Sequence, residues 1–168
     1  TPPSATSDPA VIEKALAAVN PWPLEDAWED SPLRVDDLNP AQVLSFLFAP
    51  DDLLCTGTVR NFEVSRMSEL LNRGEVGPQI VPSRNRKLKG RTKKGHLSGH
   101  CRDAVGPRSY LICEFDDPEL DADKQATLLR FLRDVAGGEL RMILHSGGKS
   151  LHGWFTAQED EASALRFF

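Results

Sequence analysis

The sequence predicts an α+β protein, in which an N-terminal subdomain of helices and irregular structure precedes a core with the element order β-α-β-β-α. Residues 110–116 and 150–156 alternate their side chains with the period of two that is typical of strands. Residues 122–136 repeat apolar side chains at helical spacing. A short strand at 140–145 and a helix that begins near residue 159 complete the predicted core.

The N-terminal region, residues 1–39, is expected to form a tail and an arm. Residues 1–9 contain three prolines and several Ser and Thr, and residues 10–19 predict a short helix that ends before an Asn-Pro pair. Residues 20–40 are rich in proline and acidic side chains. They predict an extended arm that packs through Trp22, Leu24 and Trp28.

The next region, residues 40–109, predicts a subdomain that contains a basic loop at 84–94. Residues 40–48 predict a helix, because Pro40 suits a first helical turn and four apolar side chains follow on one face: Val43, Leu44, Leu47 and Phe48. A second helix at about 65–73 ends at Gly74. Residues 79–81 predict a strand that leads into the basic loop.

The core, residues 110–168, has clearer signals. Asp121 or Asp123 caps the helix at 122–136, two glycines at 137 and 138 end it, and its apolar face is made by Leu128, Leu129, Phe131, Leu132 and Val135. The strands at 140–145 and 150–156 are expected to form a hairpin through the glycine-containing turn 146–149.

Two acidic side chains share one face of the strand at 110–116. Side chains at i and i+2 of a strand point the same way, so Ile112, Glu114 and Asp116 lie opposite Leu111, Cys113 and Phe115. Two like charges on one strand face repel each other by roughly 0.2–1 kcal/mol when exposed. A divalent cation removes this repulsion, and oxygen ligands favour Mg²⁺ or Mn²⁺ over zinc.

The strand at 150–156 places Ser150, His152 and Trp154 on one face, opposite Leu151, Gly153 and Phe155. A hydroxyl and an imidazole beside a Gly-Gly-Lys turn can bind an anion such as a triphosphate. A metal together with a triphosphate indicates nucleotidyl transfer.

These two strands resemble motifs I and II of the archaeo-eukaryotic primase superfamily, the primase-polymerases. The segments that carry the resemblance are Asp-Ala-Trp-Glu-Asp-Ser-Pro at 26–32, Asp-Asp-Leu-Leu-Cys-Thr-Gly at 51–57, Glu-Phe-Asp-Asp at 114–117 and Ser-Gly-Gly-Lys-Ser-Leu-His-Gly-Trp at 146–154. They are similar to primase-like proteins of bacteria and their mobile elements. The resemblance spans most of the chain, and its specific motifs lie in the last sixty residues or so.

The resemblance implies that Glu114 and Asp116 bind Mg²⁺ or Mn²⁺ and catalyse the reaction, and that Ser150 and His152 bind the phosphates of an NTP or dNTP. It also implies a sheet of the RNA-recognition-motif type, β-α-β-β-α-β, with its first and third strands central and its fourth strand beside the first. The fourth strand, expected to carry a third acid, is missing. Because the chain stops within the predicted last helix, we expect a fragment of a longer protein, in which a helicase or another domain is an open possibility. The acids at 159–161 are expected to interact with the helix dipole instead.

Charge is unevenly distributed along the chain. Residues 1–59 carry 2 basic and 10 acidic side chains, residues 60–111 carry 12 and 4, and residues 112–168 carry 6 and 11. Within 84–94, 7 of 11 residues are basic and none is acidic: Arg84, Arg86, Lys87, Lys89, Arg91, Lys93 and Lys94. This run is expected to be solvated and mobile. It predicts sequence-independent contact with single-stranded or template DNA, the alternative being a disordered solubilising loop.

Several other interpretations stay open. Lys149 is either a phosphate ligand or an exposed turn residue, although Ile143 replaces the first glycine that a P-loop requires. Trp154 either stacks on a base or packs against a neighbour, and His145 is expected to be structural. A zinc site is a further interpretation, but the sequence spacing of its candidate ligands matches no standard zinc motif: His96, His100, Cys101 and Cys55.

Alternatives to a primase-polymerase come from two other classes. One is a noncatalytic nucleic-acid-binding module, and the other is a metal-dependent nuclease or replication initiator. The second is disfavoured because the only tyrosine, Tyr110, lies at the far end of the strand from Asp116. Three widely spaced cysteines, no apolar run of membrane-spanning length and no signal pattern predict a cytoplasmic protein with no membrane partner.

Overall fold

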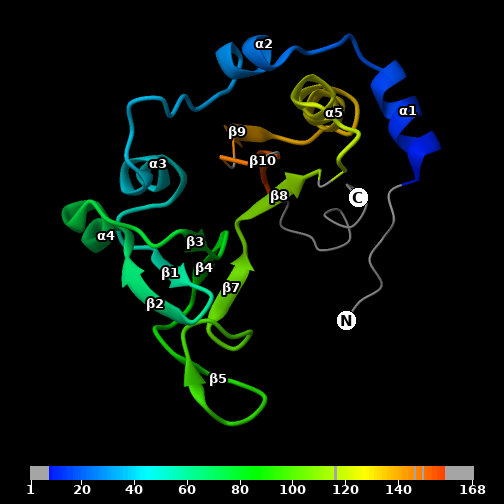
Figure 1. Ribbon diagram of the computed structural model, residues 1–168. Helices are drawn as coiled ribbons and strands as arrows, with labels where there is room; N and C mark the ends of the chain where they lie inside the picture. The colour runs from blue at the N-terminus through cyan, green and yellow to red at the C-terminus, as the bar shows by residue number, and fades with distance from the viewer. Residues whose placement is uncertain (1–7, 116, 146, 149, 158–168) are drawn as a thin grey trace. The chain divides into compact units, whose positions relative to one another are not determined.

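The protein has a mixed α+β fold, in agreement with the predicted class. The computed structural model describes residues 8–115, 117–145, 147–148 and 150–157. These residues contain five α-helices and ten strands, most of the paired strands being antiparallel (Figure 1). The chain divides into two compact units: unit 1 comprises Thr1–Arg34 and Ile112–Phe168, and unit 2 comprises Val35–Leu111. No helix within the described ranges is long and apolar enough to cross a membrane.

Unit 2 is built on a sheet with the strand order β2-β1-β4-β7, in which a further strand, β3, also pairs with β1. The bounds are β1 Leu53–Thr58, β2 Asn61–Arg66, β3 Gln79–Ile80, β4 Ser83–Asn85 and β7 Val105–Arg108. The β1–β2 hairpin, which the sequence patterns did not predict, pairs Leu53 with Arg66 through to Thr58 with Asn61. The predicted strand at 79–81 is present as β3.

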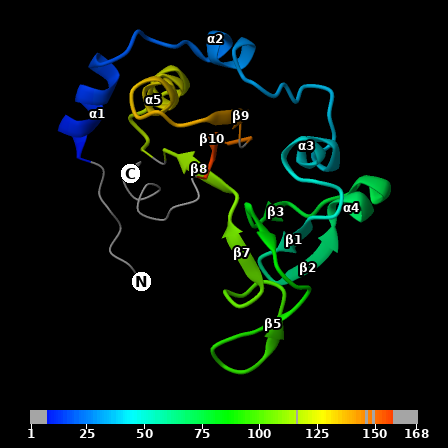
Figure 2. The same ribbon diagram turned by 180° about the vertical axis from the view of Figure 1, so that it is seen from behind.

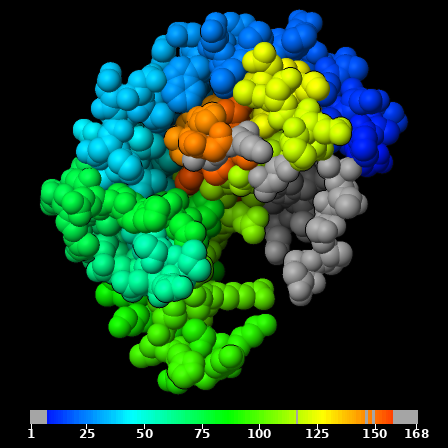
Figure 3. Space-filling model, viewed as in Figure 1, coloured from blue at the N-terminus to red at the C-terminus, as the bar shows by residue number. Residues whose placement is uncertain are grey.

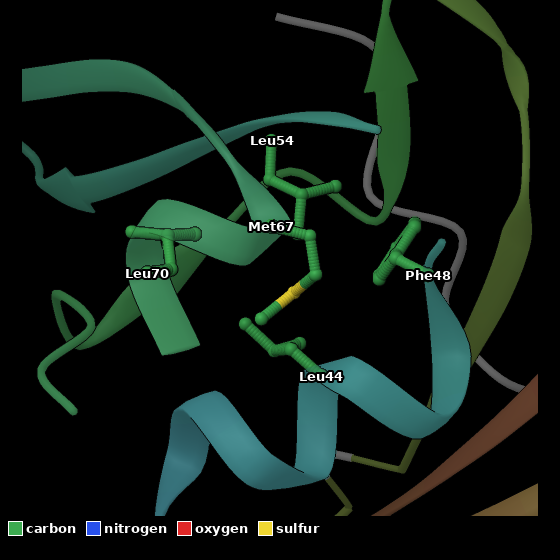
Figure 4. Close-up of a cluster of buried hydrophobic side chains, with 5 residues drawn as sticks. All are labelled: Leu44, Phe48, Leu54, Met67 and Leu70. Atoms are coloured by element: carbon green, nitrogen blue, oxygen red, sulfur yellow. The ribbon is translucent and has the colours of Figure 1, made fainter. Parts of the chain in front are cut away.

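Two helices of unit 2 were predicted nearly at their observed positions. Helix α3 (Pro40–Leu47) begins with a capping box, in which the Asn39 side chain accepts from Gln42 N–H and the Gln42 side chain accepts from Asn39 N–H. Helix α4 (Met67–Arg73) ends at Gly74, whose φ of 69° is left-handed. The helices and the sheet share an apolar cluster, shown in Figure 4: Leu44, Phe48, Leu54, Met67 and Leu70.

The predicted basic loop at 84–94 consists of turns and irregular structure at 86–89 and 92–94, interrupted by short strands. Its first residues belong to β4, and β5 (Gly90–Arg91) pairs with β6 (Leu97–Ser98) as a separate two-stranded antiparallel sheet. Figures 1 and 2 both show this part of unit 2 extending away from the larger sheet. Hydrogen bonds that the Asn85 side chain donates and the Asp103 side chain accepts give the segment this structure despite its composition.

Unit 1 contains a three-stranded sheet with the order β8-β10-β9 and the helix α5. The bounds are β8 Tyr110–Glu114, β9 Leu140–His145, β10 Leu151–Thr156 and α5 Ala122–Asp134. The Asp121 side chain caps α5 by accepting from Lys124 N–H, as one of the two predicted caps. One predicted residue of the apolar face is wrong: Val135 lies after the end of α5 and is 55% exposed.

The N-terminal segment of unit 1 is not the extended arm that we expected. It forms α1 (Pro9–Ala17) and, within the proline-rich part, a second helix, α2 (Leu24–Glu29). Figure 2 shows both near α5, and Ala15 of α1 packs against Leu120 and Leu128. The backbone N–H of Trp22 donates to Thr127 Oγ1 at 2.9 Å, and the Trp22 ring is buried beneath the Arg133 guanidinium. The helix predicted from residue 159, and the acids at 159–161, lie outside the described residues.

Candidate functional site

The alternation predicted for β8 is present. Leu111 and Cys113 are buried, Ile112 is half-buried, and the Glu114 side chain is 41% exposed at the end of the strand. Desolvation by burial raises the pKa of the Cys113 thiol to about 11, so this group stays protonated near neutral pH and is no thiolate ligand or nucleophile. Glu114 is therefore the polar group that β8 presents on its other face.

His152 on the adjacent strand β10 faces Glu114. Its Nε2 lies 2.9 Å from Glu114 Oε1, and the imidazole is 24% exposed. The Nε2 atom itself is shielded from solvent. Among the described residues it has no well-aligned hydrogen bond, because the Glu114 oxygen, although close, does not meet the angular requirement of one. The strand order, with β10 beside β8, thus brings together one predicted metal ligand and one predicted phosphate ligand.

Ser150 is buried at the start of β10. The next backbone N–H, of Leu151, donates to Gln125 Oε1 at 2.8 Å, while Gln125 Nε2 donates to the Leu120 carbonyl at 2.9 Å. Gln125 is 2% exposed and joins α5 to the strand that carries His152. Sequence reasoning missed Gln125, although its spacing of three and four residues from Leu128 and Leu129 placed it on the buried face.

The turn before β10 contains one predicted structural residue. Gly147 N–H donates to His145 Nδ1 at 3.1 Å, and Gly147 has a φ of 80°, which favours glycine. His145 thus supports the turn, as expected. The turn connects two strands, whereas a P-loop leads from a strand into a helix, which agrees with the rejection of a P-loop from Ile143 in the sequence. Asp116 and Lys149 lie outside the described residues.

Trp154 packs in the interior of unit 1. Its side chain is 4% exposed, and its neighbours Gly153 and Phe155 are also buried. Strand β10 is therefore buried on both faces over most of its length. The alternative in which Trp154 stacks on a base is therefore wrong.

Tyr110, the only tyrosine and the residue whose position disfavoured a nuclease, makes its contacts within unit 2. Its hydroxyl donates to the Leu47 carbonyl, and its ring meets Phe48 edge-on at a centroid distance of 5.3 Å. A tyrosine held in this way belongs to the apolar packing of unit 2. This observation further disfavours an attacking tyrosine at Glu114, at the other end of β8.

The described residues contain no group of three or more His, Cys, Asp or Glu arranged to hold a metal ion. The proposed zinc ligands have other partners: the His100 ring lies 4.1 Å from the Phe62 ring, and Cys101 Sγ donates to the Ser98 carbonyl. Burial, with Cys101 nearby, raises the pKa of Cys55. For Mg²⁺ or Mn²⁺ the relevant group is Glu114, whose carboxylate is partly exposed and keeps acceptor sites beyond the one near His152.

The basic side chains of unit 2 are mostly exposed. Arg84 lies 3.8 Å from Asp52 and Lys87 lies 2.9 Å from Asp103. None of the other basic side chains of the segment has an ion-pair partner in the part of the chain that is described: Arg86, Lys89, Arg91, Lys93 and Lys94. Overall, unit 2 carries 12 basic and 8 acidic residues, whereas unit 1 carries 8 and 17.

Comparison with protein-family models, with curated proteins and with solved structures finds no significant match to this chain.

Proposed function

We propose that the protein is a nucleotidyltransferase of the primase-polymerase type, which joins NTP or dNTP units on a nucleic-acid template with the help of Mg²⁺ or Mn²⁺. The observation that carries the proposal is the meeting of Glu114 and His152 at 2.9 Å on adjacent strands. A carboxylate for a metal and an imidazole for a phosphate are the two groups that the resemblance requires at these positions.

The strand order gives independent support. A sheet of the RNA-recognition-motif type has its first and third strands adjacent, with the second strand outside the third. The order β8-β10-β9, with α5 between β8 and β9 in the chain, follows this arrangement. The β-α-β-β segment that the resemblance implies is therefore compatible with the observed sheet.

The described residues fit a hard divalent cation in one respect: the Glu114 oxygens are accessible, and the shielded Nε2 of His152 beside them lacks a well-aligned hydrogen bond. Glu114, with Asp116, would hold the cation. When bound, divalent metal ions activate a 3′-hydroxyl and stabilise the leaving pyrophosphate. This chemistry would also explain why two acids occur so close together in the sequence.

The chain's own residues would prepare the nucleotide site before a nucleotide arrives. His152 is held beside Glu114 rather than free to rotate in solvent, and the Gln125 bond to Leu151 fixes the start of the strand that carries His152. A prepositioned imidazole can donate a charge-assisted hydrogen bond to a phosphate oxygen at a reduced entropy cost. Ser150, next to Leu151, is proposed as the second phosphate ligand.

Nucleotide binding is the most direct test. A deoxynucleoside triphosphate would be titrated calorimetrically into the wild type, Glu114→Gln, His152→Ala and Asp116→Asn, with Mn²⁺ or with EDTA. His96→Ala is a matched control, because it removes an exposed imidazole in unit 2. We expect binding that requires Mn²⁺, is lost in the three site variants and is kept in the control.

Circular dichroism would verify that each variant is folded. Metal-independent binding, or binding that survives both Glu114→Gln and His152→Ala, would overturn the proposed site. Absence of nucleotide binding by the folded wild type would instead favour the noncatalytic nucleic-acid-binding module.

A further inference from the structure

The basic segment, residues 84–102, has a defined structure in unit 2. At its base the Asn85 side chain, 7% exposed, donates from Nδ2 to the carbonyls of Gly99 and Lys87, at 2.9 and 3.4 Å. This one amide therefore joins the two ends of the segment. Asp103 adds a second link, because its Oδ2 accepts from Arg91 N–H at 2.7 Å and lies 2.9 Å from Lys87 Nζ.

Two glycines let the segment pack closely on the rest of unit 2. A Cβ at Gly90 would lie 2.6 Å from the Ala104 backbone nitrogen, and a Cβ at Gly99 would lie 2.3 Å from Val64 Cγ2 of β2. With contacts this short, a side chain at either position would require neighbouring atoms to shift. The hairpin β5–β6, residues 90–98 and here called the ribbon, is consequently held by its base while its loop faces solvent.

The segment presents a surface rich in positive charge. It contains no acidic residue, and of its eight Lys and Arg side chains only two have an ion-pair partner within the described ranges. The other six are all exposed: Arg86, Lys89, Arg91, Lys93, Lys94 and Arg102. Figure 3 shows long side chains projecting from this green part of the surface. Three of these charges lie on the ribbon and three lie beside it in the chain, an arrangement suited to a polyanion with regularly spaced charges.

The side chains of the segment favour a duplex over a single strand. Proteins that bind single strands combine positive charge with aromatic side chains on which the bases stack. The segment contains no Phe, Tyr or Trp, and the nearby Phe62 ring is half-buried and stacked with His100. A two-stranded ribbon fits the major groove of a duplex, which is about 12 Å wide.

We propose that the ribbon, with Arg86, Lys89 and Arg102 beside it, binds the phosphates of duplex nucleic acid from the major groove, without reading the base sequence. Duplex binding by the ribbon specifies the form of the nucleic-acid partner. It rests on the proposed function only because that function implies such a partner. Neither the metal ligands nor the nucleotide ligands take part. The ribbon thus provides a duplex anchor that is chemically separate from the Glu114–His152 site.

The test measures fluorescence anisotropy of a labelled duplex DNA of about 20 base pairs, and of its single strand, in EDTA without nucleotide and over a series of salt concentrations. Removing one cation that neutralises a phosphate reduces the magnitude of the slope of log K against log[salt] by about 0.9. Lys93→Ala with Lys94→Ala should thus lower the slope by about 1.8, and the duplex affinity by about 30-fold at about 0.15 M salt.

The matched control is Lys14→Ala with Lys124→Ala, which makes the same charge change on exposed helix positions of unit 1. We expect the control to keep the wild-type slope. Asn85→Ala should weaken duplex binding with the slope unchanged, because it loosens the base of the segment but keeps every cation.

Tighter binding to the single strand, an unchanged slope in the Lys93 and Lys94 variant, or an equal reduction of affinity in the control would overturn the inference. So would equally tight binding to phosphatidylserine vesicles, because it would mark the ribbon as a lipid-binding surface. Because the duplex assay contains EDTA and no nucleotide, it does not depend on the Glu114–His152 site. Failure of metal-dependent nucleotide binding would leave the duplex result valid, and failure of duplex binding would leave the nucleotide result valid.

Discussion

Replacing Gln125 by Leu should destabilise unit 1 more than a leucine introduced at an exposed position of the same helix. The Gln125 side chain satisfies two buried backbone groups, the Leu151 N–H and the Leu120 carbonyl. A buried group left without a partner costs about 1–3 kcal/mol, so two groups cost about 2–6 kcal/mol. Leu and Gln have similar helix propensity, and burying the more apolar side chain returns about 1–2 kcal/mol. The expected net destabilisation is about 3 kcal/mol.

Urea unfolding followed by tryptophan fluorescence measures this destabilisation in the correct unit. All three tryptophans, Trp22, Trp28 and Trp154, belong to unit 1, so the signal reports on that unit. Lys124→Leu is the matched control, because it introduces the same side chain at the exposed neighbouring position of α5 and should change stability by less than about 0.5 kcal/mol. A difference between the two variants below about 1 kcal/mol would refute the role given to Gln125.

Four further predictions test the structure. Gly153→Ala should cost unit 1 about 1–3 kcal/mol in the same urea assay, because the new Cβ would lie 2.4 Å from Leu129 Cδ2; no change would contradict this packing. Asp121→Ala should remove the cap of α5 at a cost of about 1 kcal/mol, and an equally stable variant would show that the cap contributes nothing. Burial raises the pKa of Cys113 to about 11 and also raises that of Cys55, so iodoacetamide at about pH 8 should modify half-buried Cys101 first, as detected by mass spectrometry of peptides. The folded state holds the Cys113 proton more tightly than the unfolded state does. The protonated thiol should therefore contribute stability that is complete below about pH 9 and is lost as the pH rises towards 11.

Local sequence patterns were sufficient for most of the core of unit 1. The helix α5 combines apolar spacing, an Asp cap and terminal glycines, and the strands β8 and β10 show alternation next to a turn rich in glycine. Each of these signals depends on residues within a few positions of one another. For the same reason, the meeting of Glu114 and His152 could be anticipated once the two strands were expected to be neighbours.

The missed features depend on contacts between distant parts of the chain. The turn between β1 and β2 contains Val59 and Arg60 rather than Gly or Asn, so the usual hairpin signal is absent. The basic segment has the composition of a disordered loop, yet Asn85 and Asp103 order it through hydrogen bonds to its backbone. The helix α2 is held by the Leu24 N–H bond to Asp123, a partner 99 residues away. No local pattern encodes such a partner.

The charge difference between the units bears on how the two proposals fit together. Unit 1 has 17 acidic and 8 basic residues, so it repels both a nucleotide and a nucleic-acid backbone until cations neutralise part of that charge. Unit 2, with 12 basic and 8 acidic residues, has the opposite sign. Under the proposed function, nucleic-acid affinity would therefore depend on unit 2 and on salt, whereas nucleotide affinity would depend on unit 1 and on the divalent cation. The two dependences would be separable in one protein, because each acts on a different set of side chains.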